Sequence, residues 1–148
     1  MNRLNILSVL IGFLVVFSNV SFAQDLGCSS EVELDGGVVE VAASSSGDDT
    51  ENIQCALTAA AKGGFREVYL KSKKYAISGV EVSNFVGDFR GNSIATTEVT
   101  VTNGSLDCNG MRAALRFNRG APKVTRMTLK IDEPCITAGG NASVIGFY

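Results

Sequence analysis

The chain has 148 residues and a formal net charge of -2 at pH 7, and it contains neither His nor Trp. A mildly acidic chain without a run of Lys or Arg lacks the clustered basic face that nucleic acids require, so no nucleic-acid partner is expected. The absence of His excludes a Ser-His-Asp triad, a Cys-His pair and imidazole metal ligation. Any chemistry must come from Asp, Glu, Lys, Arg, Tyr or Cys.

The N-terminus has the three parts of a secretory signal peptide. A positive charge at Arg3 precedes a nearly all-apolar run over residues 4–17, and the small residues Ser21 and Ala23 stand before Gln24. The apolar run is too short to span a bilayer comfortably, and nothing later in the chain is apolar enough to do so. The sequence therefore predicts a signal peptide over residues 1–23. The mature domain, residues 24–148, is then exported to the periplasm, the cell surface or the medium.

The first regular elements are a short strand and a helix. Residues 38–41 (VVEV) read as a strand, and residues 44–47 (SSSG) read as a turn. Four apolar residues then follow at i, i+3, i+4 and i+7, which is one face of a helix: Ile53, Ala56, Leu57 and Ala60. With Lys62 in the last turn and Gly63-Gly64 as the break, the pattern predicts a helix over about 49–62.

Three acidic residues, Asp48, Asp49 and Glu51, precede this helix. Calcium ligation is one interpretation, but the spacing is not that of an EF-hand loop. Helix capping explains the same residues more simply. An Asp at the N-cap accepts the free N–H groups of the first turn, and Asp48 and Glu51 have the spacing of a capping box. We therefore expect these acids to begin the helix.

Short strands follow the helix and make the chain β-dominated. The predicted strands are separated by Lys, Ser, Gly and Asn turns, and they cover residues 68–70, 75–77, 80–82, 85–89, 98–102, 114–117, 123–131 and 143–148. Residues 99–117 and 127–147 each contain a strand, an acidic turn, a Cys and an apolar strand that ends in Phe, which aligns Val99 with Met127 and Phe117 with Phe147. An all-β period in the twenties predicts a solenoid whose turns stack on one another.

All four cysteines lie in the predicted mature chain, so an exported protein should form two disulfides. Equivalent residues of adjacent solenoid turns lie roughly 4.8 Å apart, within disulfide reach, so Cys108 is expected to pair with Cys135. Cys28 and Cys55 remain for each other. Cys55 points away from the apolar helix face, where it can meet an N-terminal segment that crosses the outside of the helix.

Residues 38–78 resemble the N-terminal segment of pectin-lyase-like, right-handed parallel β-helix proteins. The resemblance rests on Gly47 to Thr50, Ile53-Gln54 with Ala56-Leu57, Gly63-Gly64, Val68 to Leu70 and Tyr75. It implies an all-β fold, a right-handed parallel β-helix with an N-terminal capping helix, and coils over about 66–148. Lys71-Ser72-Lys73 departs from the Pro-Ala-Gly that is common in the family.

The resemblance implies a polysaccharide as a possible partner and Ca²⁺ as a possible cofactor. It implies no catalytic residue, because none of the family's catalytic motifs matches here. A second acidic set, Asp107, Asp132 and Glu133, could do acid/base work in glycoside hydrolysis with Arg112, Arg116, Arg119 or Arg126 nearby. A solvated turn face is the favoured explanation, because turns favour Asp. Tyr69, Tyr75 and Phe89 could stack on sugars, but strand aromatics more often pack in a core. No catalytic, cofactor or metal site is therefore assigned.

The sequence stops at Tyr148 in a strand-like run, and a solenoid needs a terminal cap. We expect an exported β-helix segment that is incomplete at its C-terminus, to be covered by further coils or by another chain. Its role is expected to be non-catalytic, at a surface or on a glycan. The alternative is the N-terminal part of a polysaccharide lyase or glycoside hydrolase whose catalytic coils lie beyond Tyr148.

Overall fold

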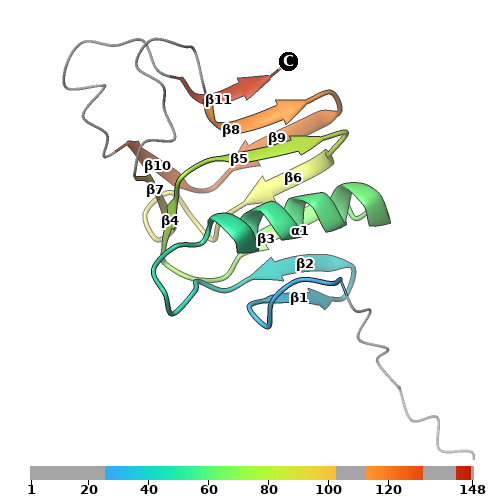
Figure 1. Ribbon diagram of the computed structural model, residues 1–148, viewed down its shortest axis with the longest axis horizontal. Coiled ribbons are helices and arrows are strands. Elements are labelled where there is room, and N and C mark those ends of the chain that lie inside the picture. The colour runs from blue at the N-terminus through green and yellow to red at the C-terminus, as the bar shows by residue number, and fades with distance from the viewer. Residues whose placement is uncertain (1–25, 103–112, 132–142, 148) are drawn as a thin grey trace, which may run out of the picture.

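A computed structural model of the chain describes residues 26–102, 113–131 and 143–147. This part of the chain contains one helix and eleven strands (Figure 1). In chain order they are β1 (Val32–Asp35), β2 (Val38–Val41), α1 (Thr50–Gly63), β3 (Glu67–Leu70), β4 (Lys74–Ile77), β5 (Val80–Ser83), β6 (Val86–Arg90), β7 (Glu98–Val101), β8 (Ala113–Asn118), β9 (Ala121–Thr125), β10 (Thr128–Ile131) and β11 (Ser143–Phe147).

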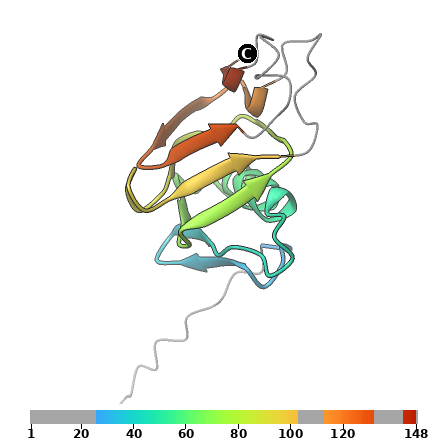
Figure 2. The same ribbon diagram turned by 90° about the vertical axis from the view of Figure 1, so that its left-hand side faces the viewer.

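The strands form three sheets, with the orders β1-β2-β3-β6-β9, β10-β7-β4 and β11-β8-β5. From β3 onward, successive strands enter the three sheets in the same rotation. All neighbours are parallel except the antiparallel pair β1 and β2. Figures 1 and 2 show the strands of each sheet lying above one another, with β1 at one end of the stack and β11 at the other. The described chain is thus mostly β, with parallel strands and one helix, as the sequence predicted.

The hydrophobic core consists of columns of inward side chains, one from each strand of a sheet. Alternate strand residues point inward, so paired residues stack directly. In the β2-β3-β6 column Val39 is paired with Val68, and Val68 with Phe89. All three are fully buried. The fold therefore depends on register, because a slip of one residue would turn each column outward.

Helix α1 packs its apolar face on the first strands. Ile53, Ala56, Leu57 and Ala60 are all fully buried, as the periodicity predicted. Its contacts are mainly with β5, and also with β2 and β3 (Figure 1). The helix runs one residue later than the predicted 49–62, and Gly64 ends it in a left-handed conformation.

Strand β1 is absent from the strands that the sequence predicts. Val32 and Leu34 alternate with acidic residues, and the two glycines that follow join β1 to β2 with φ of 54° at Gly36 and 87° at Gly37. Positive φ at both central residues is what a two-residue hairpin turn of type I′ requires, and it favours Gly. The Gly-Gly pair before residues 38–41 was the available signal.

The strand bounds and the strand partners each differ from the sequence prediction at one place. The single strand expected over 123–131 is two strands, because Arg126 adopts φ of 56° and the chain passes there from one sheet to another. The alignment of Phe117 with Phe147 matches the register of β8 and β11, whereas Val99 pairs with Leu129 rather than Met127. Both observed pairs are 30 residues apart, so the alignment of Val99 with Met127, which are 28 apart, was two residues short.

Gly87 in β6 should tolerate no side chain. It has φ of 147°, and a Cβ there would lie 2.1 Å from the Arg66 carbonyl oxygen. Gly87→Ala is expected to lower the unfolding free energy by on the order of 3 kcal/mol, because backbone strain and the clash combine. The matched control is Gly47→Ala, where φ is 82° but nothing lies within 4 Å. It should cost about 1 kcal/mol. Urea denaturation of both variants checks this, and equal losses would contradict it.

Candidate functional site

The acids before α1 have structural partners. The Asp49 side chain is buried at 2% exposure. One carboxylate oxygen accepts the Ser44 N–H at 2.5 Å and the other accepts the Ala76 N–H at 2.8 Å. The Asp49 N–H donates to the Ala76 carbonyl at 2.8 Å. Ala76 lies on β4, the end strand of its sheet, so Asp49 supplies the donor and acceptor that another strand would offer.

Gln54 does the same for β5, which is the end strand of the third sheet. Its amide nitrogen donates to the Glu81 carbonyl at 2.6 Å, and its amide oxygen accepts the Glu81 N–H at 2.8 Å. Thr50 adds a bond between these two points, because its hydroxyl accepts the Ser78 N–H at 2.8 Å. Side chains at the start of α1 therefore satisfy backbone groups along the edges of β4 and β5.

The expected capping box is wrong in its details. Asp49, not Asp48, is the N-cap residue, and its side chain makes no capping hydrogen bond because both oxygens bind Ser44 and Ala76. The exposed Asp48 accepts the Thr50 N–H at 2.9 Å, and hydrogen bonds from Thr50 lower the pKa of Asp48 below its usual value. Glu51 is an acidic residue of the first turn, which suits the helix dipole.

The three aromatic residues considered for sugar stacking do not share a face. Tyr75 and Phe89 are buried in the core. Tyr69 points outward from β3, where the Arg90 guanidinium lies 4.3 Å from its ring centroid. Glu67 holds Arg90 in place by accepting its Nε–H at 2.6 Å. The outward aromatic ring is thus covered by a paired cation and is not an open stacking platform.

Tyr75 carries a buried polar group in the core. Its hydroxyl donates to the Val41 carbonyl at 2.6 Å and accepts the Ser72 N–H at 2.7 Å. Burial raises the pKa of Tyr75 above its usual value. The neutral phenol therefore serves as a structural link between the loop after β3 and the end of β2.

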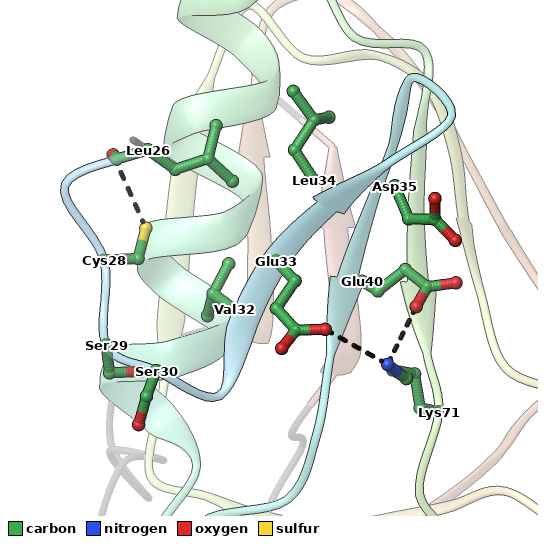
Figure 3. Close-up of a pocket in the computed structure, with 10 residues that line it drawn as sticks. All are labelled: Leu26, Cys28, Ser29, Ser30, Val32, Glu33, Leu34, Asp35, Glu40 and Lys71. Atoms are coloured by element: carbon green, nitrogen blue, oxygen red, sulfur yellow. Dashed lines mark hydrogen bonds and ion pairs between the residues drawn. The ribbon is translucent and has the colours of Figure 1, made fainter. Parts of the chain in front are cut away.

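A pocket of about 610 Å³ lies beside β1 (Figure 3). Lys71 lies between Glu33 and Glu40, with its ammonium 3.4 Å and 2.9 Å from their carboxylates. The hydrogen bond to Glu40, above all, raises the pKa of Lys71. Leu26 and Asp35 are among the other residues that line the pocket. The cation is already paired twice, so the pocket resembles a strand-linking charge cluster more than a catalytic centre.

Two smaller hollows lie elsewhere. One of about 380 Å³ follows the outer side of α1. Another of about 260 Å³ lies beside β7 and contains Lys74, Glu98 and the exposed Ile94. Glu98 is 2.5 Å from Lys130 on β10, and the hydrogen bond from Lys130 lowers the pKa of Glu98. These carboxylates are paired across strands and are not gathered around a common centre.

The structure contains the Cys28–Cys55 disulfide that the sequence predicted. The two Cα atoms are 5.8 Å apart, and the bridge joins the segment before β1 to the outer side of α1. Cys108 and Cys135, with Asp107, Asp132, Glu133 and Arg112, lie outside the described residues. Of the other arginines, Arg116 pairs with Glu81 at 3.2 Å, and Arg119 and Arg126 occupy turns with positive φ.

No group of three or more His, Cys, Asp or Glu side chains that could hold a metal occurs among residues 26–102, 113–131 and 143–147. In the same ranges, no helix is long and apolar enough to cross a membrane. No protein-family model, curated protein or solved structure matches the chain.

The buried carboxylate of Asp49 should matter far more than its exposed neighbour. Asp49→Asn replaces an acceptor by an NH₂ donor facing an N–H group, and it is expected to cost about 2–3 kcal/mol of unfolding free energy. The control is Asp48→Asn, one residue away and exposed, which should cost about 0.5 kcal/mol or less. Denaturant titration of both proteins gives the comparison. Equal effects would show that Asp49 is not an edge partner.

The Glu98–Lys130 pair should produce a measurable titration shift. Glu98 is expected to titrate below its ordinary pKa of 4.5 in the folded protein, and Lys130→Met should return that pKa toward 4.5. Because the folded pKa is depressed, the pair stabilises the protein above the unfolded pKa, and this is lost as pH falls through the folded one. Carboxyl NMR follows the titration, with Lys62→Met as the control. An unchanged Glu98 pKa in Lys130→Met would contradict the pairing.

Proposed function

We propose that the chain forms the first turns of an exported, right-handed parallel β-helix of the pectin-lyase-like type, with a non-catalytic, structural role. The rotation of the chain through three sheets supports this. Strands β3, β4 and β5 are followed in the same sheets by β6, β7 and β8, and then by β9, β10 and β11. A solenoid is the arrangement in which each turn contacts only its neighbours in this way.

The first end of the stack is closed in all three sheets. Strand β1 covers β2 by antiparallel pairing. Asp49 satisfies the backbone of Ala76 on β4, and Gln54 satisfies that of Glu81 on β5. Unpaired strand edges invite association, and natural proteins cover them. The N-terminal segment therefore serves as the closed base of the stack.

The opposite end differs, and this contrast carries the proposal. Among the described residues, β9, β10 and β11 each have one hydrogen-bonded neighbour. The inward residues Val124, Leu129 and Ile145 are only partly buried, whereas their partners one layer deeper, Phe89, Val99 and Leu115, are essentially fully buried. A surface with open backbone groups and half-buried apolar side chains fits a further β layer.

Pro122 decides how such a layer would bind. The Ala121 N–H donates to the Phe85 carbonyl on the β6 side. Successive residues of a strand direct their backbone polar groups to opposite sides, so the backbone of Pro122 is directed away from β6. Pro has no N–H to offer a new strand. The added layer would therefore bind mainly through β10 and β11, and less through β9.

The surface chemistry and the disulfide support an exported structural part. Carboxylates of the outer faces pair with cations of neighbouring strands, as in Glu67 with Arg90 and Asp88 with Lys123. The Cys28–Cys55 bridge fits an oxidising compartment. Signal cleavage after Ala23 and attachment to a surface or glycan complete the proposal.

The test compares two residues in one column of the core. Residues 24–148 made alone should self-associate through the β9–β11 end. Leu129→Lys is expected to reduce that association while cooperative melting remains, because Leu129 lies in the partly exposed last layer. Val99→Lys is the matched control in the layer beneath and should unfold the protein, because it buries an unpaired charge. Sedimentation velocity and thermal melting report both effects.

A monodisperse wild-type monomer that melts cooperatively would contradict the proposal. Depolymerisation of a polysaccharide by residues 24–148 alone would contradict the non-catalytic role. In that case the protein would be a lyase or hydrolase with its site in this chain.

A further inference from the structure

A covalent strap holds the edge strand β1 in place. Residues 26–31 run along the outer side of α1 before β1 begins (Figure 3). Cys28 is bonded to Cys55 of the helix. One residue later, the Ser29 hydroxyl donates to the buried Asn52 amide oxygen at 2.6 Å. The strap therefore has one covalent and one polar attachment to α1.

Strand β1 occupies the outer edge of β2. The Ala42 N–H donates to the Glu31 carbonyl at 2.8 Å, whereas the Val41 carbonyl faces the other way and accepts the Lys71 N–H at 2.9 Å. Alternate backbone groups of β2 thus depend on β1 alone. Without β1, this edge would present free donors and acceptors.

Few non-covalent contacts hold β1 in place. The strand has four residues, of which only Val32 is buried, and Glu33 is 64% exposed even in its contact with Lys71. An isolated two-stranded hairpin is marginal in water. At one end β1 is fixed by the disulfide, and at the other by the Gly36-Gly37 turn. Loss of the disulfide would leave the turn as a hinge.

We propose that the Cys28–Cys55 disulfide prevents β1 from exchanging between two copies of this chain, and that its reduction permits the exchange. A dithiol reductant gives two electrons and two protons, the S–S bond breaks, Cys28 and Cys55 become thiols, and the dithiol becomes a cyclic disulfide. The freed β1 of one copy then pairs with β2 of the other.

The partner is a second copy of this chain, because its β1 is already complementary to the outer edge of β2. Exchange remakes the Val32 contact with the core, the link from Glu33 to Lys71 and the four-residue antiparallel register, but between chains. Identical elements that swap through a hinge give closed dimers at low energetic cost. Cys28 of one copy would then lie beside Cys55 of the other, and reoxidation would make the dimer covalent.

The experiment mixes ¹⁴N-labelled and ¹⁵N-labelled chains at equal, high concentration, reduces them with dithiothreitol, then removes the reductant and reoxidises. Peptide mapping without reduction isolates the Cys28–Cys55 linked peptides, and Cys108 and Cys135 do not interfere because their peptides differ. We expect about half of these linked peptides in the dimer fraction to carry one ¹⁴N and one ¹⁵N half. An unreduced mixture is the control and should give none.

Amide exchange under reducing conditions separates exchange from unfolding. The Ala42 amide, which donates to the Glu31 carbonyl, should exchange at least tenfold faster than in the oxidised protein. The Lys71 amide, which donates to the Val41 carbonyl, should stay protected. If every linked peptide carries a single isotope, in the whole sample or in the dimer fraction, the proposal is wrong. Equal acceleration at Lys71 would also overturn it, because the whole sheet would then have opened. Association through β9–β11 does not exchange β1 between chains, so each linked peptide would keep a single isotope. The experiment therefore distinguishes this association from the exchange of β1.

Discussion

The structure depends on one buried carboxylate. Asp49 binds the backbone N–H groups of Ser44 and Ala76, and its own N–H returns a bond to Ala76. A buried ionic acceptor with fewer partners would cost several kcal/mol, so the position strongly favours Asp. These bonds join the loop after β2 to the edge of β4 and fix where α1 begins. With the helix placed there, Gln54 reaches the edge of β5.

The molecule therefore has two unlike ends. At the first end, a hairpin strand, a carboxylate and an amide complete the three sheets by different means. At the other end, the described strands have one neighbour each, and Leu129 and Ile145 remain partly exposed. Side-chain groups can replace a strand at one or two positions, but only another strand can replace a whole ladder and cover its apolar face.

Much of the local structure could be predicted from the sequence. The periodicity of Ile53 to Ala60 predicted α1 and its buried face. The Cys28–Cys55 bridge was predicted because the expected pairing of Cys108 with Cys135 left these two cysteines for each other. The role of Asp49 could not be predicted in this way. Its partner Ala76 lies 27 residues away on another element, and capping is the only role that neighbouring residues reveal. The same limit applied to Val99, whose partner Leu129 lies 30 residues away on another strand.

The sequence by itself determined most of the elements and the buried face of α1, because helix and strand periods are local properties of the chain. The tertiary structure alone decided which strands are neighbours, which acids are buried and which aromatic residues point inward. Tyr69 and Tyr75 are close in sequence and similar in type, yet one lies under Arg90 at the surface and the other lies in the core. Burial is set by neighbours that come from distant parts of the chain, and these neighbours exist only once the sheets have stacked.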